Sequence, residues 1–473
     1  MTFLKKMQCI RRGEPVSPRV PPMFCHRRLF TAVRMAWLFG GLMVCHGVSL
    51  AQNLAVAGRP GMADLLPYEA SPPMHAAFDG LLTRAMSAHP NVRSAVSQAQ
   101  GAQWDVDVAK WAFWPSLTVN AQRSDDPQNA LPGASNFTIQ QPLWNAGALA
   151  ARLSAAEKAG QSSAEQIQVV QADLGLRLVD AWASLLDAEA TRSVTGRALE
   201  GLNRYQAIMQ RRVQAGLSSA VDLRMLSVRV TRAQTDLADA HVSSQIALKR
   251  LEQLVGSPVQ SFLEDLREPL PRSALSRWAK AQPGLPVTDR LAQLPAVRKA
   301  ELDAAVAADQ LSAQKADRWP KVVLSYQRRL GALPTNFDRS LWAVGLNYTP
   351  GSGLAALSQT AADQARLQAR LEAVESVRQE KQEQLTLDWA ALQREFDRQG
   401  SLLATIESAG DVLASYERLY FSGLKTWLEV LNAQQELTQS ELRLAQSGNA
   451  TTLAYYRWRL RSGDLPLHAD WRR

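Results

Sequence analysis

Two residue types are scarce in separate parts of this 473-residue sequence. Cysteine is missing after residue 45, and acidic residues are nearly missing from residues 1–51. All three cysteines, Cys9, Cys25 and Cys45, precede residue 52, so the rest of the chain offers neither a disulfide framework nor a thiolate metal site. Residues 1–51 hold eight basic residues and one acid, Glu14, and so carry +7 of the net charge of +9. The remainder is nearly neutral, which excludes a working domain that binds nucleic acid through a basic patch.

The basic N-terminal stretch has the pattern of a secretory signal. Its last basic residue is Arg34, and an apolar run follows that ends in small residues before Gln52. We therefore expect residues 1–51 to be a signal peptide and the mature chain to be exported. A membrane anchor is the alternative, although the apolar run is short for a spanning helix. Met23 or Met35 could also be the start of the chain.

Sequence motifs for catalysis and metal binding are missing as well. The histidines after residue 51 lie far apart, and none has a metal-ligand partner one helical turn away. They are His75, His89, His241 and His468. The sequence contains no P-loop, no nucleophile elbow and no HExxH motif. We therefore expect no catalytic residue, no metal and no cofactor, and we exclude an enzyme.

Proline is missing from two stretches of equal length, residues 143–257 and 351–465. Short sequence matches link the two parts of the chain in the same order. They are HPNVRSA (89–95) with LPAVRKA (294–300), KWAFWPSLTV (110–119) with KADRWPKVVL (315–324), and QAGLSSAVDL (214–223) with FSGLKTWLEV (421–430). Offsets of 205 to 207 positions that agree in this way indicate an internal duplication.

Each repeat is predicted to hold a helix, a β-hairpin and a long helical hairpin. The first helices, about 76–113 and 292–318, end at Trp-Pro, because the residue before proline avoids the helical conformation. Period-two patterns predict the strands 116–122, 135–143, 321–327 and 340–348. The helical hairpins join 148–215 to 219–256 and 354–421 to 426–461. Their longer arms would reach about 100 Å and pack as coiled coils.

These elements predict a membrane protein of mixed α and β class. Four short strands cannot close a barrel, and open sheet edges are not tolerated in a bilayer. Three copies would supply twelve strands, each about long enough to cross a bilayer. Tryptophans cluster beside the strand ends, where either an interfacial position or ordinary core packing would explain them. They are Trp111, Trp114, Trp144, Trp319 and Trp342.

The predicted domain boundaries follow from the duplication. They are a signal peptide at 1–51, an extended N-terminal segment at 52–75, a first repeat at 76–256, a linker or equatorial belt at 257–291, a second repeat at 292–461 and a C-terminal tail at 462–473.

The duplicated repeats, the Trp-Pro before each hairpin and the two G-L-x-[ST]-x-x-[DE] turns resemble the TolC family of outer-membrane efflux and export proteins. The turns begin at Gly216 and Gly423. The resemblance covers roughly residues 76–461. It implies a homotrimer with a twelve-stranded outer-membrane β-barrel, continued by a long periplasmic α-helical barrel with a belt at residues 257–291. The expected localisation is the outer membrane, with an extension into the periplasm.

The chain is similar in particular to the outer-membrane component of a type I exporter for an adenylate cyclase–haemolysin toxin. That similarity implies a passive exit duct for a protein cargo. Its partners would be an inner-membrane ABC transporter, a periplasmic adaptor protein, outer-membrane lipid and the exported cargo, with no nucleic acid. The alternative function is the outer-membrane component of a multidrug efflux pump.

The resemblance also implies a gate and selectivity site at the periplasmic end of the helical barrel. The matching positions are Tyr420, Lys425, Glu429 and Asn432, with Asp222 as the partner on the neighbouring helix turn. Lysine stands where the family has an arginine that links helices, and Asn432 stands where it has a second acid. Three copies of Glu429 facing a narrow pore would attract cations. The alternative is that Glu429 is a solvated residue near a helix turn.

Two other classes of exported protein compete with the duct. A soluble periplasmic coiled-coil scaffold needs no barrel, and the four strand patterns argue against it. A pore-forming toxin needs a switch from a soluble to an inserted state, and no segment marks one. Cell fractionation separates these classes, because they predict protein in the outer membrane, in the periplasm or in the medium.

Overall fold

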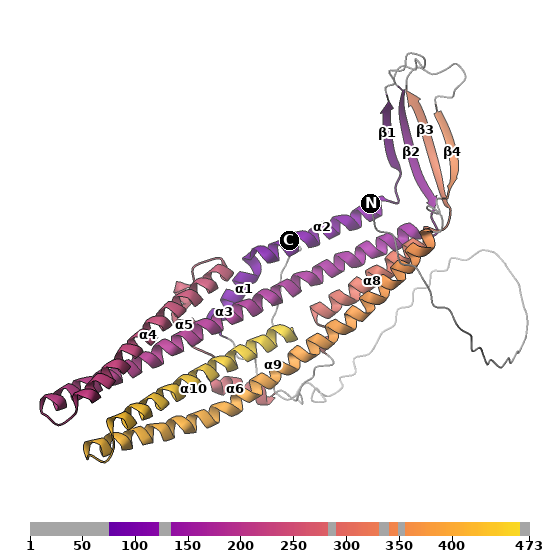
Figure 1. Ribbon diagram of the computed structural model, residues 1–473. Coiled ribbons are helices and arrows are strands. Elements are labelled where there is room, and N and C mark those ends of the chain that lie inside the picture. The colour runs from indigo at the N-terminus through magenta and orange to yellow at the C-terminus, as the bar shows by residue number, and fades with distance from the viewer. Residues whose placement is uncertain (1–74, 123–133, 282–289, 331–339, 349–354, 464–473) are drawn as a thin grey trace, which may run out of the picture. The chain divides into compact units, whose positions relative to one another are not determined.

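The structure, a computed structural model, describes residues 75–122, 134–281, 290–330, 340–348 and 355–463. The predicted signal peptide, nearly all of the predicted N-terminal segment and most of the predicted C-terminal tail lie outside these residues. The described chain is mostly helical with one small sheet, as expected (Figure 1). Among these residues, no helix is long and apolar enough to cross a bilayer.

The two repeats contain the same elements in the same order. The first holds α1 (Ala76–Ala88), α2 (Pro90–Trp111), β1 (Ser116–Gln122), β2 (Ala134–Trp144), α3 (Ala148–Gln214) and α4 (Ala220–Val255). The second holds α8 (Pro295–Ala316), β3 (Lys321–Leu330), β4 (Ser340–Asn347), α9 (Ala355–Phe421) and α10 (Trp427–Ser462). α3 and α9 each have 67 residues, and α4 and α10 each have 36. The proline-free stretches thus became two helical hairpins of matched length.

The predicted first helix is wrong in one respect, because the structure divides it into α1 and α2. His89 separates them with an extended backbone, at φ −66° and ψ 136°. The cause is Pro90, since a residue before proline is driven out of the helical conformation. The His89 ring accepts a hydrogen bond from the Asn91 backbone N–H at 3.2 Å and so caps α2.

The sheet is a four-stranded antiparallel ribbon in the order β1-β2-β3-β4. β2 and β3 join the two repeats at its centre, with Ile139 opposite Tyr326. β1 and β4 therefore form the edges, and within the described chain each pairs on one side only. Pro142 coincides with a register shift between β2 and β3, as expected of a residue without a backbone donor.

The long helices lie side by side (Figure 1). α3 packs along α4, α8 and α10, and α9 packs along α8 and α10. The two helical hairpins are thereby held together along α3 and α10. At Gly175 on α3, an added Cβ atom would lie only 2.7 Å from a methyl carbon of Leu460 on α10. Glycine at this position lets the two helices approach closely.

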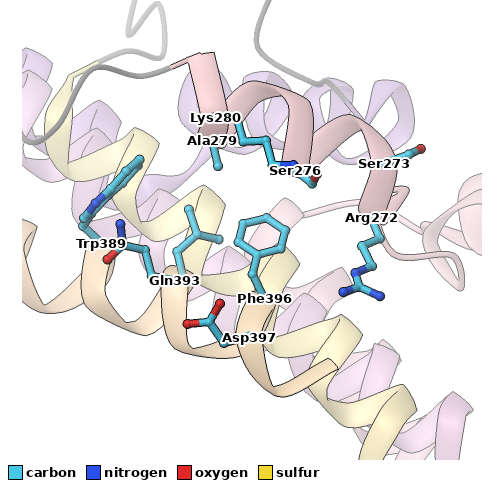
Figure 2. Close-up of a pocket in the computed structure, with 10 residues that line it drawn as sticks. Arg272, Ser273, Ser276, Ala279, Lys280, Trp389, Gln393, Phe396 and Asp397 are labelled. Atoms are coloured by element: carbon cyan, nitrogen blue, oxygen red, sulfur yellow. The ribbon is translucent and has the colours of Figure 1, made fainter. Parts of the chain in front are cut away.

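The predicted belt contains η2 (Gln260–Phe262), α5 (Leu263–Leu266) and α6 (Arg272–Ala281). These short elements cover the main apolar core, which also includes residues of α1, α3, α9 and α10. The Trp182 indole N–H donates to the Leu266 carbonyl at 2.8 Å, and Trp278 packs edge-on against Tyr455 and Trp458. A pocket remains between α6 and α9, with Trp389 and Phe396 on one wall (Figure 2).

A buried carboxylate ties the belt to the helices. Glu189 on α3 is 7% exposed and pairs with Arg192 at 2.8 Å and Arg267 at 3.4 Å. It also accepts a hydrogen bond from the Ser244 hydroxyl on α4. Burial alone would raise the pKa of Glu189, but the hydrogen bonds from Ser244 and Arg192 and the charge of Arg267 outweigh it and hold that pKa below its ordinary value. We call these four residues the Glu189 cluster.

Candidate functional site at the tips of the helical hairpins

Both predicted glycine turns are helix ends followed by a reversal of the chain. Gly216 and Gly423 have φ of +71° and +78°. In each turn the leucine after the glycine donates its backbone N–H to a carbonyl five residues earlier, Leu217 to Arg212 at 2.8 Å and Leu424 to Leu419 at 2.9 Å. This is the Schellman arrangement, and it favours glycine because other residues are strained at positive φ.

The second part of the shared motif begins the returning helix. Glu429 accepts hydrogen bonds from the Thr426 backbone N–H and hydroxyl, both at 2.9 Å, and so forms a capping box at the start of α10. In the first repeat, the Ser219 hydroxyl accepts from the Val221 N–H at 3.1 Å. Sequence reasoning missed this role, although Thr-x-x-Glu before an apolar run is the signal for it.

Glu429 also pairs with Lys425. The Lys425 ammonium lies 2.6 Å from a Glu429 carboxylate oxygen and 4.5 Å from the centre of the Tyr416 ring. The hydrogen bonds from Lys425 and Thr426 lower the pKa of Glu429 to about 2. The same pair raises the pKa of Lys425 above its ordinary value. Glu429 is therefore ionised at any physiological pH, with a cation beside it that offsets part of its charge.

Acid is expected to loosen the start of α10. The folded-state pKa of Glu429 is lower than its ordinary value of 4.5, so its contribution to stability is present above pH 4.5 and is lost as the pH falls toward 2. Amide hydrogen exchange at the Glu429 backbone, corrected for intrinsic rates, should speed up across this range. In Glu429→Gln the start of α10 should exchange faster than in the wild type above pH 4.5 and show no such dependence, so the exchange rates of the two proteins should converge in acid. An equal pH dependence in the two proteins would contradict the assignment.

Tyr420 lies between the two hairpins. Its hydroxyl is 3.1 Å from the Ser218 hydroxyl, and its ring centre is 5.3 Å from the Arg212 guanidinium carbon. The ring also contacts Trp427 at 5.0 Å, in a small apolar cluster that includes Met209, Leu226 and Val430. Tyr420 therefore links the last turn of α9 to the tip of the first hairpin.

Asn432 faces an arginine of the first hairpin. Arg229 on α4 donates to the Asn432 amide oxygen at 3.3 Å and also to the Gln435 amide oxygen. Sequence reasoning did not single out Arg229, because nothing in the spacing of α4 marks which of its residues meets α10. Asp222 lies half-buried in the first turn of α4, and its partnership with the second hairpin stays a prediction.

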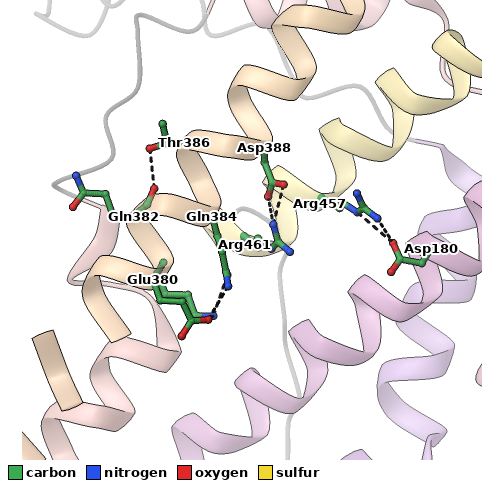
Figure 3. A network of polar contacts seen from close by, with 9 residues as sticks. Asp180, Glu380, Gln382, Gln384, Thr386, Asp388, Arg457 and Arg461 are labelled. Carbon is green, nitrogen blue, oxygen red and sulfur yellow. Dashed lines mark hydrogen bonds and ion pairs between the residues drawn. The ribbon is translucent and has the colours of Figure 1, made fainter. Parts of the chain in front are cut away.

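Polar pairs continue along the seam between the hairpins above the tips. They are Tyr205–Glu417, Arg197–Glu441 at 3.2 Å, Asn449–Asp187 at 2.8 Å and Arg457–Asp180 at 2.8 Å. Figure 3 shows Arg457 reaching Asp180 on α3, while Arg461, one turn further along α10, binds Asp388 on α9 at 2.7 Å. The seam is thus polar over much of its length.

The fold and the sequence both match known outer-membrane proteins. Residues 81–257 match the family model described as outer membrane efflux protein. In structure, the chain superposes on the Campylobacter jejuni CmeC outer membrane channel with a TM-score of 0.69 and 11% identity, over 88% of this chain and 94% of that one. The architecture is therefore that of the TolC-like outer-membrane channels, as the sequence predicted.

Three curated proteins are similar to the chain in sequence. The chain is 26% identical to the cobalt-zinc-cadmium resistance protein CzcC of Cupriavidus metallidurans, over 50% of this chain and 54% of CzcC. It is 25% identical to protein CyaE of Bordetella pertussis, over 63% of this chain and 65% of CyaE. It is also 25% identical to the proteases secretion protein PrtF of Dickeya chrysanthemi, over 80% and 87%. The chain thus spans about half the length of CzcC and about two thirds of CyaE.

Residues 81–257 match the outer membrane efflux protein family, and this match and the three relatives confirm the resemblance to the TolC family. It is an outer-membrane protein with a periplasmic extension. The family is one of transport channels, so the exclusion of an enzyme is also confirmed.

Proposed function

We propose that the chain is one protomer of a homotrimeric duct, in which three four-stranded sheets close into a twelve-stranded barrel across the outer membrane. The observation that carries the proposal is the amphipathic sheet with two free edges. One face is apolar and holds Leu117, Val119, Phe137, Ile139, Leu324, Tyr326, Trp342, Val344 and Leu346. The opposite face is mostly polar and holds Thr118, Asn120, Asn136, Thr138, Gln140, Ser325 and Gln327, together with the apolar Val323, Leu341 and Ala343. Such alternation suits lipid outside and water inside.

The exposure of the apolar face supports this orientation. Val344 and Leu346 are 69% and 71% exposed in the protomer. Exposing apolar side chains to water costs free energy, and contact with lipid would remove that cost. The tryptophans near the strand ends are at least half exposed as well, which rules out core packing within the protomer. They are Trp111, Trp114, Trp144, Trp319 and Trp342. Interfacial positions at the edges of the bilayer account for them.

The helical hairpins would continue the duct into the periplasm and end at the tips. There, Tyr420, Lys425, Glu429 and Asn432, with Asp222, form the gate and the selectivity site. Leu217 and Leu424 are 66% and 73% exposed at the two turns, which supports docking of a periplasmic adaptor protein on the tips. An inner-membrane ABC transporter would then deliver the cargo.

The favoured cargo is a protein toxin exported by a type I secretion system. PrtF, which matches most of this chain, is named for the secretion of proteases. The second candidate function is efflux, which the name of the metal-resistance protein CzcC favours. The two functions differ in the phenotype of a deletion strain. Loss of one extracellular protein supports secretion, and hypersensitivity to metals or drugs with normal secretion supports efflux.

The selectivity site is tested by Glu429→Gln in planar lipid bilayers. We expect the wild-type channel to favour potassium over chloride, and we expect that preference to weaken in Glu429→Gln and to persist in Glu429→Asp. Because Lys425 offsets part of the charge and Asn432 carries none, the preference should be moderate even in the wild type. A permeability ratio that is the same in all three proteins would remove Glu429 from the selectivity site.

A further inference from the structure

Two consecutive arginines near the loop end of β3 lie on opposite faces of the sheet. Arg328 pairs in register with Phe137 and Ser340, so it shares the apolar face with Tyr326. Arg329 pairs with Asn136 and shares the polar face with Gln327. Alternation along a strand allows no other arrangement, because successive side chains point to opposite faces.

Arg329 is set apart by the absence of an acidic residue from the described strands of the sheet. The four described strands contain no aspartate or glutamate. On the polar face they carry one other cation, Lys321, at the opposite end of β3, and it pairs with Asp317 at 2.8 Å. The cross-strand neighbour of Arg329 is the uncharged Asn136, so the charge of Arg329 is not neutralised by the sheet.

The position of Arg329 along the strand places it far from the helices. β3 starts at Lys321, close after α8, and ends at Leu330 beside the loop to β4. At about 3.4 Å per residue, Arg329 lies about 27 Å from Lys321 along the strand. In a barrel whose helices extend into the periplasm, this end of the strand is the external mouth of the pore.

We propose that three copies of Arg329 form a ring at the external mouth of the pore that attracts anions. The proposal rests on the proposed trimeric duct, whose polar sheet face lines the lumen. A guanidinium group stays protonated at all accessible pH values, so the ring is a permanent positive charge. The duct would then have a negative group, Glu429, at its inner end and a positive ring at its outer end. Anionic solutes and acidic segments of a cargo would meet the ring as they leave.

Adjacent arginines provide a matched pair of variants for the test. Both Arg329→Gln and Arg328→Gln remove one positive charge per protomer at the same height, but only the first changes the lumen. The loops carry charges of both signs, Arg123 and Arg339 against Asp125, Asp126 and Asp338, so the comparison is made between variants. Purified channels are placed in planar bilayers under a potassium chloride gradient, and the reversal potential is measured.

We expect Arg329→Gln to raise the potassium-to-chloride permeability ratio by about twofold or more, while Arg328→Gln leaves it at the wild-type value. Arg329→Lys should restore the wild-type ratio, and none of these ratios should change between neutral and mildly alkaline pH. Equal ratios for Arg329→Gln and Arg328→Gln would overturn the proposal while leaving the duct intact. A wild-type protein that forms no channel would overturn both.

Discussion

In the variant Glu189→Ala, we expect most of the protein molecules not to reach a stable folded state in the outer membrane. Glu189 is buried, and its carboxylate holds Ser244, Arg192 and Arg267 together. Removing one partner of a buried ion pair costs about 3–5 kcal/mol per protomer. In Glu189→Ala, Arg192 would lose this acid and Arg267 would keep only the exposed Glu264. Arg192 and Arg267 keep some contact with water, so we expect the lower end of this range. That loss is still a large part of the stability of an ordinary domain.

The matched control for Glu189 is Glu264, which pairs with the same arginine. Glu264 lies 2.5 Å from Arg267, but its side chain is 86% exposed. An exposed pair contributes little to stability, so Glu264→Ala should behave as the wild type. Two quantities are measured on protein extracted in detergent from isolated outer membranes. They are the amount of protein recovered and the temperature at which the proposed trimer dissociates. Equal effects of Glu189→Ala and Glu264→Ala would show that the Glu189 cluster does not hold the belt in place.

The second large effect is expected from Arg229→Glu, which should open the periplasmic end of the duct. The change removes the hydrogen bonds to Asn432 and Gln435 and places a carboxylate beside their amide oxygens. Arg229 is half-buried, so we estimate a loss of about 1 kcal/mol per protomer. Over the three copies of the proposed trimer this would amount to on the order of a hundredfold in the equilibrium between closed and open states. Single-channel conductance at low voltage should rise severalfold.

Two further variants distinguish opening from general damage. Combining Arg229→Glu with Asn432→Lys exchanges the donor and the acceptor between α4 and α10, and it should return the conductance toward the wild-type level. Arg224→Glu changes an exposed arginine on the same helix and should leave the conductance unchanged. If Arg229→Glu conducts like the wild type, or if the combined variant fails to restore closure, Arg229 does not hold the seam.

Local patterns in the sequence accounted for the elements of the two repeats, but not for the short helices of the belt. Two stretches free of proline predicted helices that the structure resolves as α3 with α4 and α9 with α10. Alternation of polar and apolar residues predicted four strands, and the structure extends β3 to Leu330. The break at His89 was also readable, because Pro90 follows it. Where a single residue type constrains the backbone, sequence alone is therefore informative.

The contacts between the repeats could not be predicted in the same way. Arg229 meets Asn432 and Gln435 only because α4 and α10 converge beside α3, and no periodicity within α4 distinguishes it from Arg224 or Arg232. The Glu189 cluster draws its members from α3, α4 and the belt, which are distant in sequence. By contrast, the capping role of Glu429 could be predicted from the Thr-x-x-Glu pattern that begins at Thr426. Glu429 thus has a structural role in addition to the role in the pore that the sequence predicted.

The central claim is that three copies of this chain close one barrel, and it is tested most directly by native mass spectrometry of protein extracted in mild detergent from the outer membrane. The two free sheet edges and the bare apolar face predict a particle of three chains, with no stable monomer or dimer. A single chain per particle, or a chain recovered only from the periplasm, would contradict the account.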